Sequence, residues 1–87
     1  MIQKLIANKI KNITKDNLKQ LANEHHISLN DKEINYLYYK LHHDWYDFIY
    51  NDPTPILNDI KANINKDSFD QLLIIYNQYK DKYQGYL

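Results

Sequence analysis

Cysteine and arginine are both absent from this 87-residue sequence, and glycine occurs only once. Without cysteine, the chain can form no disulfide, zinc–thiolate site, iron–sulfur cluster or thiol nucleophile. Without arginine, it lacks the side chain best suited to bidentate contacts with phosphate or guanine. A single glycine also excludes a glycine-rich phosphate-binding loop. These absences exclude many common cofactor and nucleotide sites.

Long apolar runs are missing as well, since no stretch approaches the roughly 18 residues of a membrane span. Residues 1–15 interrupt their apolar positions with lysine and asparagine, which is unlike the apolar core of a signal peptide. One glycine and two prolines among 44% hydrophobic residues favour packed helices over disorder. We therefore expect a soluble, cytoplasmic chain without a membrane partner, folded as a single helical domain over residues 1–87.

The charges balance overall but are unevenly distributed along the chain. Residues 1–19 contain five lysines and one acid, whereas residues 20–60 contain seven acids and two lysines. If the chain binds nucleic acid, this basic segment is the best candidate for phosphate contacts, through Lys4, Lys9, Lys11, Lys15 and Lys19. A solvated helix face is the commoner meaning of such a run, so nucleic acid is the weaker partner hypothesis.

Apolar residues recur with helical spacing in five segments, and none shows the alternation typical of strands. We expect helices over about 2–11, 15–25, 31–50, 55–63, and 66 or 67 to 84. Thr14 fits an N-cap, Asn30 and Glu33 fit a capping box, and Thr54 before Pro55 fits the start of the fourth helix. The expected fold class is all-α, a compact bundle of about five helices around a long central third helix.

The third predicted helix carries two stripes on nearly opposite faces. The first has the spacing of a core-facing surface and contains Ile34, Leu37, Tyr38, Leu41, Trp45, Phe48 and Ile49. The second is an aromatic row with two titratable groups, and its members are Tyr36, Tyr39, His43, Tyr46, Asp47 and Tyr50. Neighbouring helices would bury this row if they covered the third helix on both sides. If part of the row is exposed, it can bind a protein, because tyrosine is enriched in interface hot spots.

Side chains able to carry chemistry do not form a catalytic pattern. The four histidines occur as two adjacent pairs, His25–His26 and His42–His43. Neighbours on a helix point about 100° apart, so neither pair readily chelates one metal. His43 and Asp47 share a face, but two ligands are fewer than zinc or iron needs. Ser28 and Ser68 lack a base arrangement or glycine-rich turn nearby. We therefore expect no catalytic residues, metal or cofactor, and no enzyme.

A helix-turn-helix unit is the most specific competing interpretation. Residues 21–28 resemble the first helix and turn of such a unit. The register then fails, because His26 stands where the turn usually has glycine and Ile34 follows about two residues late for a recognition helix. That helix would also begin with Asp31 and Glu33, which would point acids towards phosphate. A nucleic-acid-binding or regulatory domain with a degenerate helix-turn-helix segment remains the alternative function.

Three segments carry a resemblance to a family: NITKDNL at 12–18, ISLNDKEI at 27–34 and FDQLLIIY at 69–76. With them, the chain resembles a family of short helical proteins of unknown function from low-GC Gram-positive bacteria. The segments are helix-cap and core patterns, so the resemblance implies a small cytoplasmic helical protein and brings no catalytic residue, cofactor or partner.

The sequence therefore favours a non-enzymatic interaction or adaptor module that binds a protein partner or a second copy of itself. The expected contacts on the third helix are Tyr36, Tyr39, His43, Tyr46 and Tyr50. Tyr83 and Tyr86, near the end of the chain, are further expected contacts.

Overall fold

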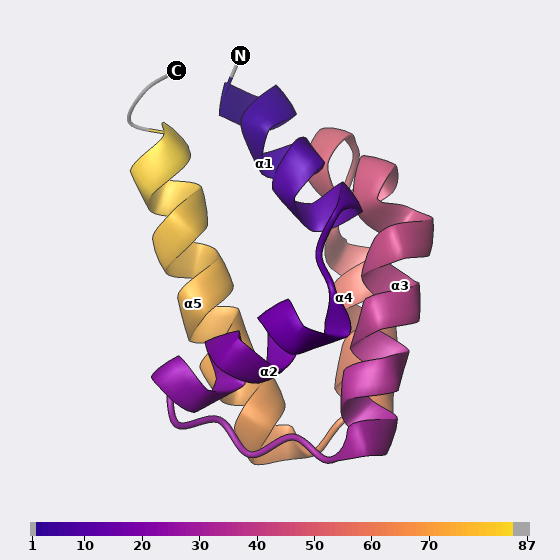
Figure 1. The fold of residues 1–87 in the computed structure, drawn as a ribbon. Coiled ribbons are helices and arrows are strands. Elements are labelled where there is room, and N and C mark those ends of the chain that lie inside the picture. The colour runs from indigo at the N-terminus through magenta and orange to yellow at the C-terminus, as the bar shows by residue number, and fades with distance from the viewer. Residues whose placement is uncertain (1, 85–87) are drawn as a thin grey trace.

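The computed structural model describes the backbone of residues 2–84 and the side chains of residue 4 and residues 7–78. Five helices form in the described part: α1 (Ile2–Lys11), α2 (Lys15–Glu24), α3 (Asp31–Tyr50), α4 (Thr54–Asn63) and α5 (Lys66–Gln84). Short connections join them into a compact particle of 35 × 23 × 23 Å (Figure 1). The predicted all-α class and the positions of the five helices are confirmed.

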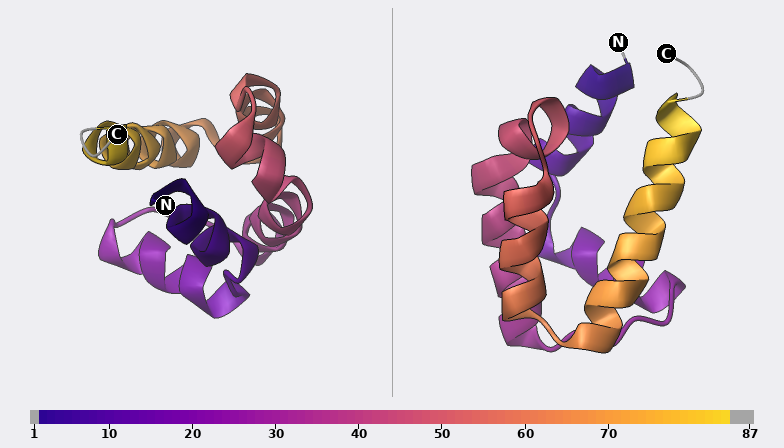
Figure 2. Two further views of the ribbon diagram at one scale, coloured as in Figure 1. Left: turned by 90° about the horizontal axis from the view of Figure 1, so that it is seen from above. Right: turned by 180° about the vertical axis from the view of Figure 1, so that it is seen from behind.

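The arrangement is organised around α3, the longest helix. The helices α1, α2 and α4 each pack against α3, whereas α5 packs mainly against α4. Viewed from above, α1 and α2 lie to one side of α3 and α4 lies to another, while none of the described helices lies beside the remaining side of α3 (Figure 2). The third helix is therefore central to the contacts of the bundle but is not covered all round.

Local sequence signals start α2 and α3 where they were predicted to start. The Thr14 hydroxyl accepts the Asn17 backbone N–H at 3.0 Å, and the Asn17 side chain accepts the Thr14 N–H at 3.0 Å. Asn30 and Glu33 form the same reciprocal pair at the start of α3, with distances of 2.8 and 3.0 Å. Each pair satisfies two backbone donors that a helix N-terminus would otherwise leave without partners.

The start of α4 differs from the prediction. Thr54 is the first helical residue and not the cap, a position that Pro53 occupies without a side-chain hydrogen bond. The Asp52 carboxylate instead accepts the Thr54 N–H at 3.0 Å. The prediction was wrong because the Asp52 side chain, two residues earlier, satisfies the Thr54 N–H. Thr54 therefore need not act as the cap and is the first residue of the helix.

The end of α2 is a Schellman motif that places His26 in a left-handed conformation. The Ile27 N–H donates to the Ala22 carbonyl at 2.8 Å, and the His26 N–H donates to the Asn23 carbonyl at 3.3 Å. This geometry requires the positive φ of 56° at His26, which glycine adopts without steric cost. The buried Ile27 then returns the chain to the core.

Replacing His26 by glycine is expected to raise the free energy of unfolding by about 0.5–1 kcal/mol, because it removes the steric cost of the left-handed backbone. Urea denaturation measures the change. His25→Gly is the matched control, since His25 has a φ of −103° and gains nothing from glycine. Equal effects of the two substitutions would contradict the assignment of strain to His26.

The core collects side chains from α2, α3, α4 and α5 and from the connection before α5. Its buried members are Leu18, Ile34, Leu37, Ile56, Ile60, Ile64 and Phe69. Tyr38, Leu41 and Phe48 of α3 are half-buried and pack against this cluster. The first stripe of the third helix thus faces the core as predicted, most completely at Ile34 and Leu37, which are 2% and 4% exposed.

Glu33 joins the starts of α3 and α5 from a buried position. Besides capping Asn30, its carboxylate accepts two hydrogen bonds from Asn65, from the backbone N–H at 2.6 Å and from the side-chain amide at 3.0 Å. The Asn65 side chain in turn accepts the Ser68 N–H at 2.8 Å. The hydrogen bond from the Asn30 backbone, reinforced by those from Asn65, lowers the pKa of Glu33 against the opposing effect of burial. The charged carboxylate therefore ties two helix starts together.

Candidate functional site

The side of α3 without a neighbouring helix carries most of the second predicted stripe. Among the described large hydrophobic side chains, four are exposed: Tyr39 (65%), Tyr46 (56%), Tyr50 (39%) and Ile74 (51%). Three of these four belong to this stripe, and the side chain of His43 between them is 85% exposed. We call Tyr39, His43, Tyr46 and Tyr50 the outer face of α3. The sequence left open whether neighbouring helices bury this stripe or leave it exposed, and these four residues are exposed.

Tyr36 differs from the other predicted contacts. It is half-buried and packs against the core cluster, with Asp59 and Asn63 of α4 nearby. Burial raises the pKa of its hydroxyl, and the charge of Lys40 nearby partly opposes this increase. Tyr36 therefore borders the outer face and does not project from it. Tyr83 and Tyr86 lie outside the described side chains.

The exposed tyrosines are supported by rings beside them. Tyr46 lies edge-on to Trp45 with ring centroids 5.6 Å apart, and tilted against Tyr50 at 4.9 Å. Tyr39 lies edge-on to Tyr38 at 5.4 Å. Such aromatic pairs restrict the side-chain rotamers. Rotamers limited in this way would reduce the conformational entropy that the rings lose on binding.

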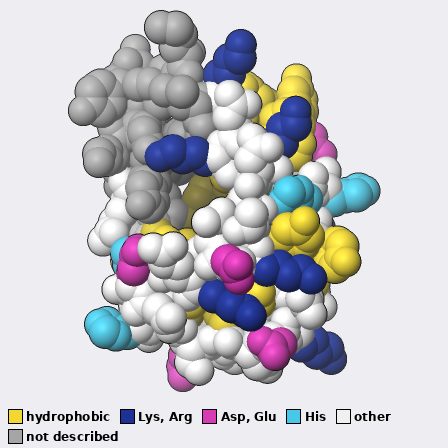
Figure 3. Space-filling model, in the orientation of Figure 1, with side chains coloured by type: hydrophobic (Ala, Val, Ile, Leu, Met, Phe, Trp, Pro, Cys, Tyr) yellow, Lys and Arg dark blue, Asp and Glu magenta, His cyan; other side chains and the backbone are white. Residues whose placement is uncertain are grey.

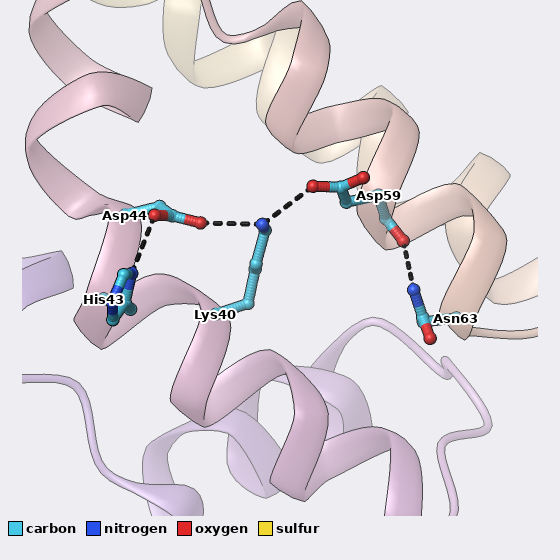
Figure 4. Close-up of polar contacts among 5 residues, drawn as sticks. All are labelled: Lys40, His43, Asp44, Asp59 and Asn63. Atoms are coloured by element: carbon cyan, nitrogen blue, oxygen red, sulfur yellow. Dashed lines mark hydrogen bonds and ion pairs between the residues drawn. The ribbon is translucent and has the colours of Figure 1, made fainter.

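A charged network lies beside the outer face, between α3 and α4 (Figure 4). The Lys40 ammonium is 2.7 Å from an Asp44 carboxylate oxygen and 2.9 Å from one of Asp59. These hydrogen bonds raise the pKa of Lys40, and the bond to Asp44 has the larger effect. In turn, the hydrogen bond from Lys40, and to a smaller extent that from His43, lowers the pKa of Asp44. Lys40 is thus held charged and paired, which does not suit it to act as a base or nucleophile.

The pairing of Lys40 with Asp44 and Asp59 was not predicted from the sequence. The spacing of Lys40 and Asp44 was a visible signal, because residues four apart on a helix can pair. Asp59 gave no signal, since it is 19 residues away and meets Lys40 only through the packing of α4 on α3. Asp44 also has non-helical dihedral angles, φ −110° and ψ 15°, which mark a kink in α3 beside the outer face.

A shallow depression of about 580 Å³ opens on the middle of α3. Tyr36, Tyr39, Lys40 and His43 line it, together with His42 and Asp44. The first four residues have the spacing i, i+3, i+4, i+7, so they form the diamond-shaped gap that four neighbouring side chains leave on a helix surface. This is the kind of gap that receives one side chain from an adjacent helix.

Two lysines of the predicted basic surface, Lys11 and Lys15, lie against aromatic rings of α3. The Lys11 ammonium lies 5.5 Å from the centroid of Trp45, and that of Lys15 lies 5.2 Å from Tyr38 and 5.5 Å from Tyr39. These are cation–π distances. Lys4, Lys9 and Lys19 are exposed. The sequence contained no signal for the pairing, because it depends on how α1 and α2 pack against α3.

The surface of this region mixes side-chain types. Figure 3 shows hydrophobic, lysine and histidine side chains close together over α3, at the right of the view. His42, which is half-buried, hydrogen-bonds to the Ile13 carbonyl through Nε2, and its ring centroid lies 4.4 Å from that of Tyr38. Because a carbonyl only accepts, His42 carries a proton on Nε2. This bond fixes the α1–α2 connection to α3.

The remaining candidate groups have other neighbours. His43 contacts Asp44 at 3.0 Å, and Asp47 accepts a hydrogen bond from the Asn51 side chain at 2.6 Å, so the two side chains predicted to share a face have different neighbours. Ser68 is buried, and its hydroxyl donates to the Ser28 carbonyl. Within the described residues, no group of three or more histidine or acidic side chains is placed to hold a metal.

None of the described helices combines the length and the apolar character needed to cross a membrane. Comparison of the chain with protein-family models gave no match, and neither did comparison with curated proteins or with solved structures. The resemblance to short helical proteins of low-GC Gram-positive bacteria therefore stays a prediction.

Proposed function

We propose that this chain is a non-enzymatic interaction module that binds a helix of a protein partner through the outer face of α3. The observation that carries the proposal is the concentration of exposed tyrosines on one side of one helix, at Tyr39, Tyr46 and Tyr50. Tyrosine provides large contact area at a low cost in conformational entropy and is enriched in interface hot spots.

The spacing along α3 supports a helix as the bound element. The outer face and its border residue Tyr36 follow one another at intervals of three, four, three and four residues: Tyr36, Tyr39, His43, Tyr46 and Tyr50. This is the alternation of the inward-facing positions in paired helices. The depression lined by Tyr39 and His43 offers an opening for a side chain of such a helix.

Charge favours a protein partner over nucleic acid. Lysines beside aromatic rings, as at Lys11 and Lys15, are also found on surfaces that bind single-stranded nucleic acid. However, the exposed Asp47 lies along the same side of α3, and Lys40 is already paired with two carboxylates. The connection between α2 and α3 also has six residues, 25–30, which is longer than a helix-turn-helix turn.

Site-specific photo-crosslinking tests the proposal. A benzophenone amino acid placed at Tyr46 in the full chain is expected to form a covalent adduct with a protein in cells that produce the chain. The same group at Ile74, which is exposed on α5 to a similar extent, is the control and is expected to form much less adduct. The absence of a protein adduct at Tyr46, or an adduct mainly with nucleic acid, would contradict the proposal.

A further inference from the structure

We infer that the partner helix is α3 of a second copy of this chain, packed antiparallel about a two-fold axis beside His43. This inference rests on the proposed function, because it names the occupant of the same outer face. Three features of α3 point to it: the symmetry of the aromatic row, the distribution of charge along it and the position of the depression.

The aromatic row is nearly symmetric about His43. Tyr36 and Tyr50 lie seven residues before and after it, and Tyr39 and Tyr46 lie four before and three after it. The kink at Asp44 lies one residue from this centre, so a two-fold axis beside His43 brings the kinks of two antiparallel copies together. The segment of α3 before the kink in one copy, with Tyr36, then lies opposite the segment after the kink in the other, with Tyr50. Tyr39 likewise lies close to Tyr46, which is one residue from the position directly opposite it. A two-fold interface requires this self-complementarity, because the same surface contributes both sides.

Charge distinguishes the antiparallel from the parallel arrangement. The Lys15 ammonium lies over the ring of Tyr39, in the first half of the row, and the exposed Asp47 lies in the second half. In the antiparallel pair, Asp47 of one copy approaches Tyr39 and Lys15 of the other, so opposite charges meet twice. In a parallel pair, Asp47 would face Asp47. The opposed helix dipoles also favour the antiparallel arrangement.

The position of the depression supports the alignment in which the His43 residues of the two copies are opposed. Its lining residues Tyr36, Tyr39, Lys40 and His43 are centred between positions 39 and 40. With the two His43 residues opposed, the position that faces this centre on the second copy is Tyr46 or its neighbour Asp47. Tyr46 is 56% exposed, so its ring projects enough to enter the gap. Each copy would thus insert Tyr46 into the depression of the other.

The available area sets the strength of this association. From their exposed fractions, Tyr39, Tyr46 and Tyr50 together offer on the order of 300 Å² per copy. Two copies, with the polar residues around them, then approach the lower end of specific interfaces, about 1,000 Å² in total. We therefore expect a dimer that forms in the micromolar range and dissociates on dilution.

Sedimentation equilibrium of the full chain from about 1 µM to about 1 mM tests the inference. The wild type is expected to pass from monomer to dimer, and Tyr46→Ala is expected to weaken association by about tenfold or more. Ile74→Ala, which trims an exposed apolar side chain on α5, is the matched control and is expected to leave association unchanged. Circular dichroism checks that each variant is folded.

Charge reversal tests the orientation. Lys15→Glu alone and Asp47→Lys alone are each expected to weaken the dimer, because each brings like charges together. The double variant is expected to recover most of the loss, since it restores opposite charges across the antiparallel interface. Additive losses in the double variant would overturn the antiparallel arrangement.

The outcomes separate this inference from the proposed function. A chain that stays monomeric at about 1 mM, or a Tyr46→Ala variant that associates like the wild type, would overturn the second copy as occupant. If the Tyr46 photo-adduct then contains a different protein, the proposed function stands without the dimer. If no protein adduct forms either, both proposals fail.

Discussion

Replacing Leu37 by alanine is expected to lower the free energy of unfolding by about 3 kcal/mol, while Tyr46→Ala is expected to change it by less than about 1 kcal/mol. Leu37 is 4% exposed and belongs to the buried core cluster, so alanine leaves a cavity there. Tyr46 is on the opposite side of the same helix and is 56% exposed. Urea denaturation at a concentration where the chain is monomeric measures both values.

The contrast tests the two-sided character of α3. If Tyr46→Ala destabilises the monomer as much as Leu37→Ala, the tyrosine is part of the fold and the outer face is not available to a partner. Tyr39→Ala, at 65% exposure, extends the comparison to the first half of the row and is expected to behave like Tyr46→Ala. Loss of binding in these two variants would then reflect lost contact area.

Replacing Glu33 by glutamine is expected to cost about 2 kcal/mol at neutral pH, because the buried carboxylate accepts three hydrogen bonds that strengthen with its charge. The native pKa of Glu33 is lowered from 4.5, first by the bond from the Asn30 backbone. Its stabilisation is therefore fully present above about pH 4.5 and is lost as the pH falls through the lower, native-state value.

The pH dependence supplies the sharper measurement. Unfolding free energies of the wild type and Glu33→Gln are expected to differ most at neutral pH and to converge as the solution is acidified. Glu24→Gln is the matched control, because Glu24 is exposed and its one recorded contact is a 3.2 Å bond from Gln20. If both substitutions gave the same small effect at every pH, Glu33 would not be the link between α3 and α5.

Much of the fold was predictable because its signals are local. Thr14 and Asn30 mark the starts of α2 and α3 through side chains that act within one turn of helix. The prolines after Asn51 forbid continuation of α3, and its end at Tyr50 agrees with that expectation. Apolar spacing then identified Ile34 and Leu37 as core residues, since a helix repeats its faces every 3.6 residues.

The candidate site was only half predictable. The sequence placed the tyrosines on one stripe, but the exposure of Tyr39 and Tyr46 depends on which side of α3 the other helices leave uncovered. The contacts of Glu33 with Asn65 and of Lys40 with Asp59 join residues 32 and 19 positions apart. Such contacts follow from the packing of whole helices, which the periodicity of each helix alone does not determine.

The central claim is that the outer face of α3 is exposed in the single chain and covered in its complex. Hydroxyl-radical footprinting of the full chain, read by mass spectrometry at low and high protein concentration, tests this claim most directly. We expect Tyr39, Tyr46 and Tyr50 to be oxidised at low concentration and protected at high concentration, while the buried Phe69 stays protected throughout. Tyrosines protected at every dilution would contradict the exposed outer face, and tyrosines oxidised equally at every concentration would contradict its coverage by a second copy.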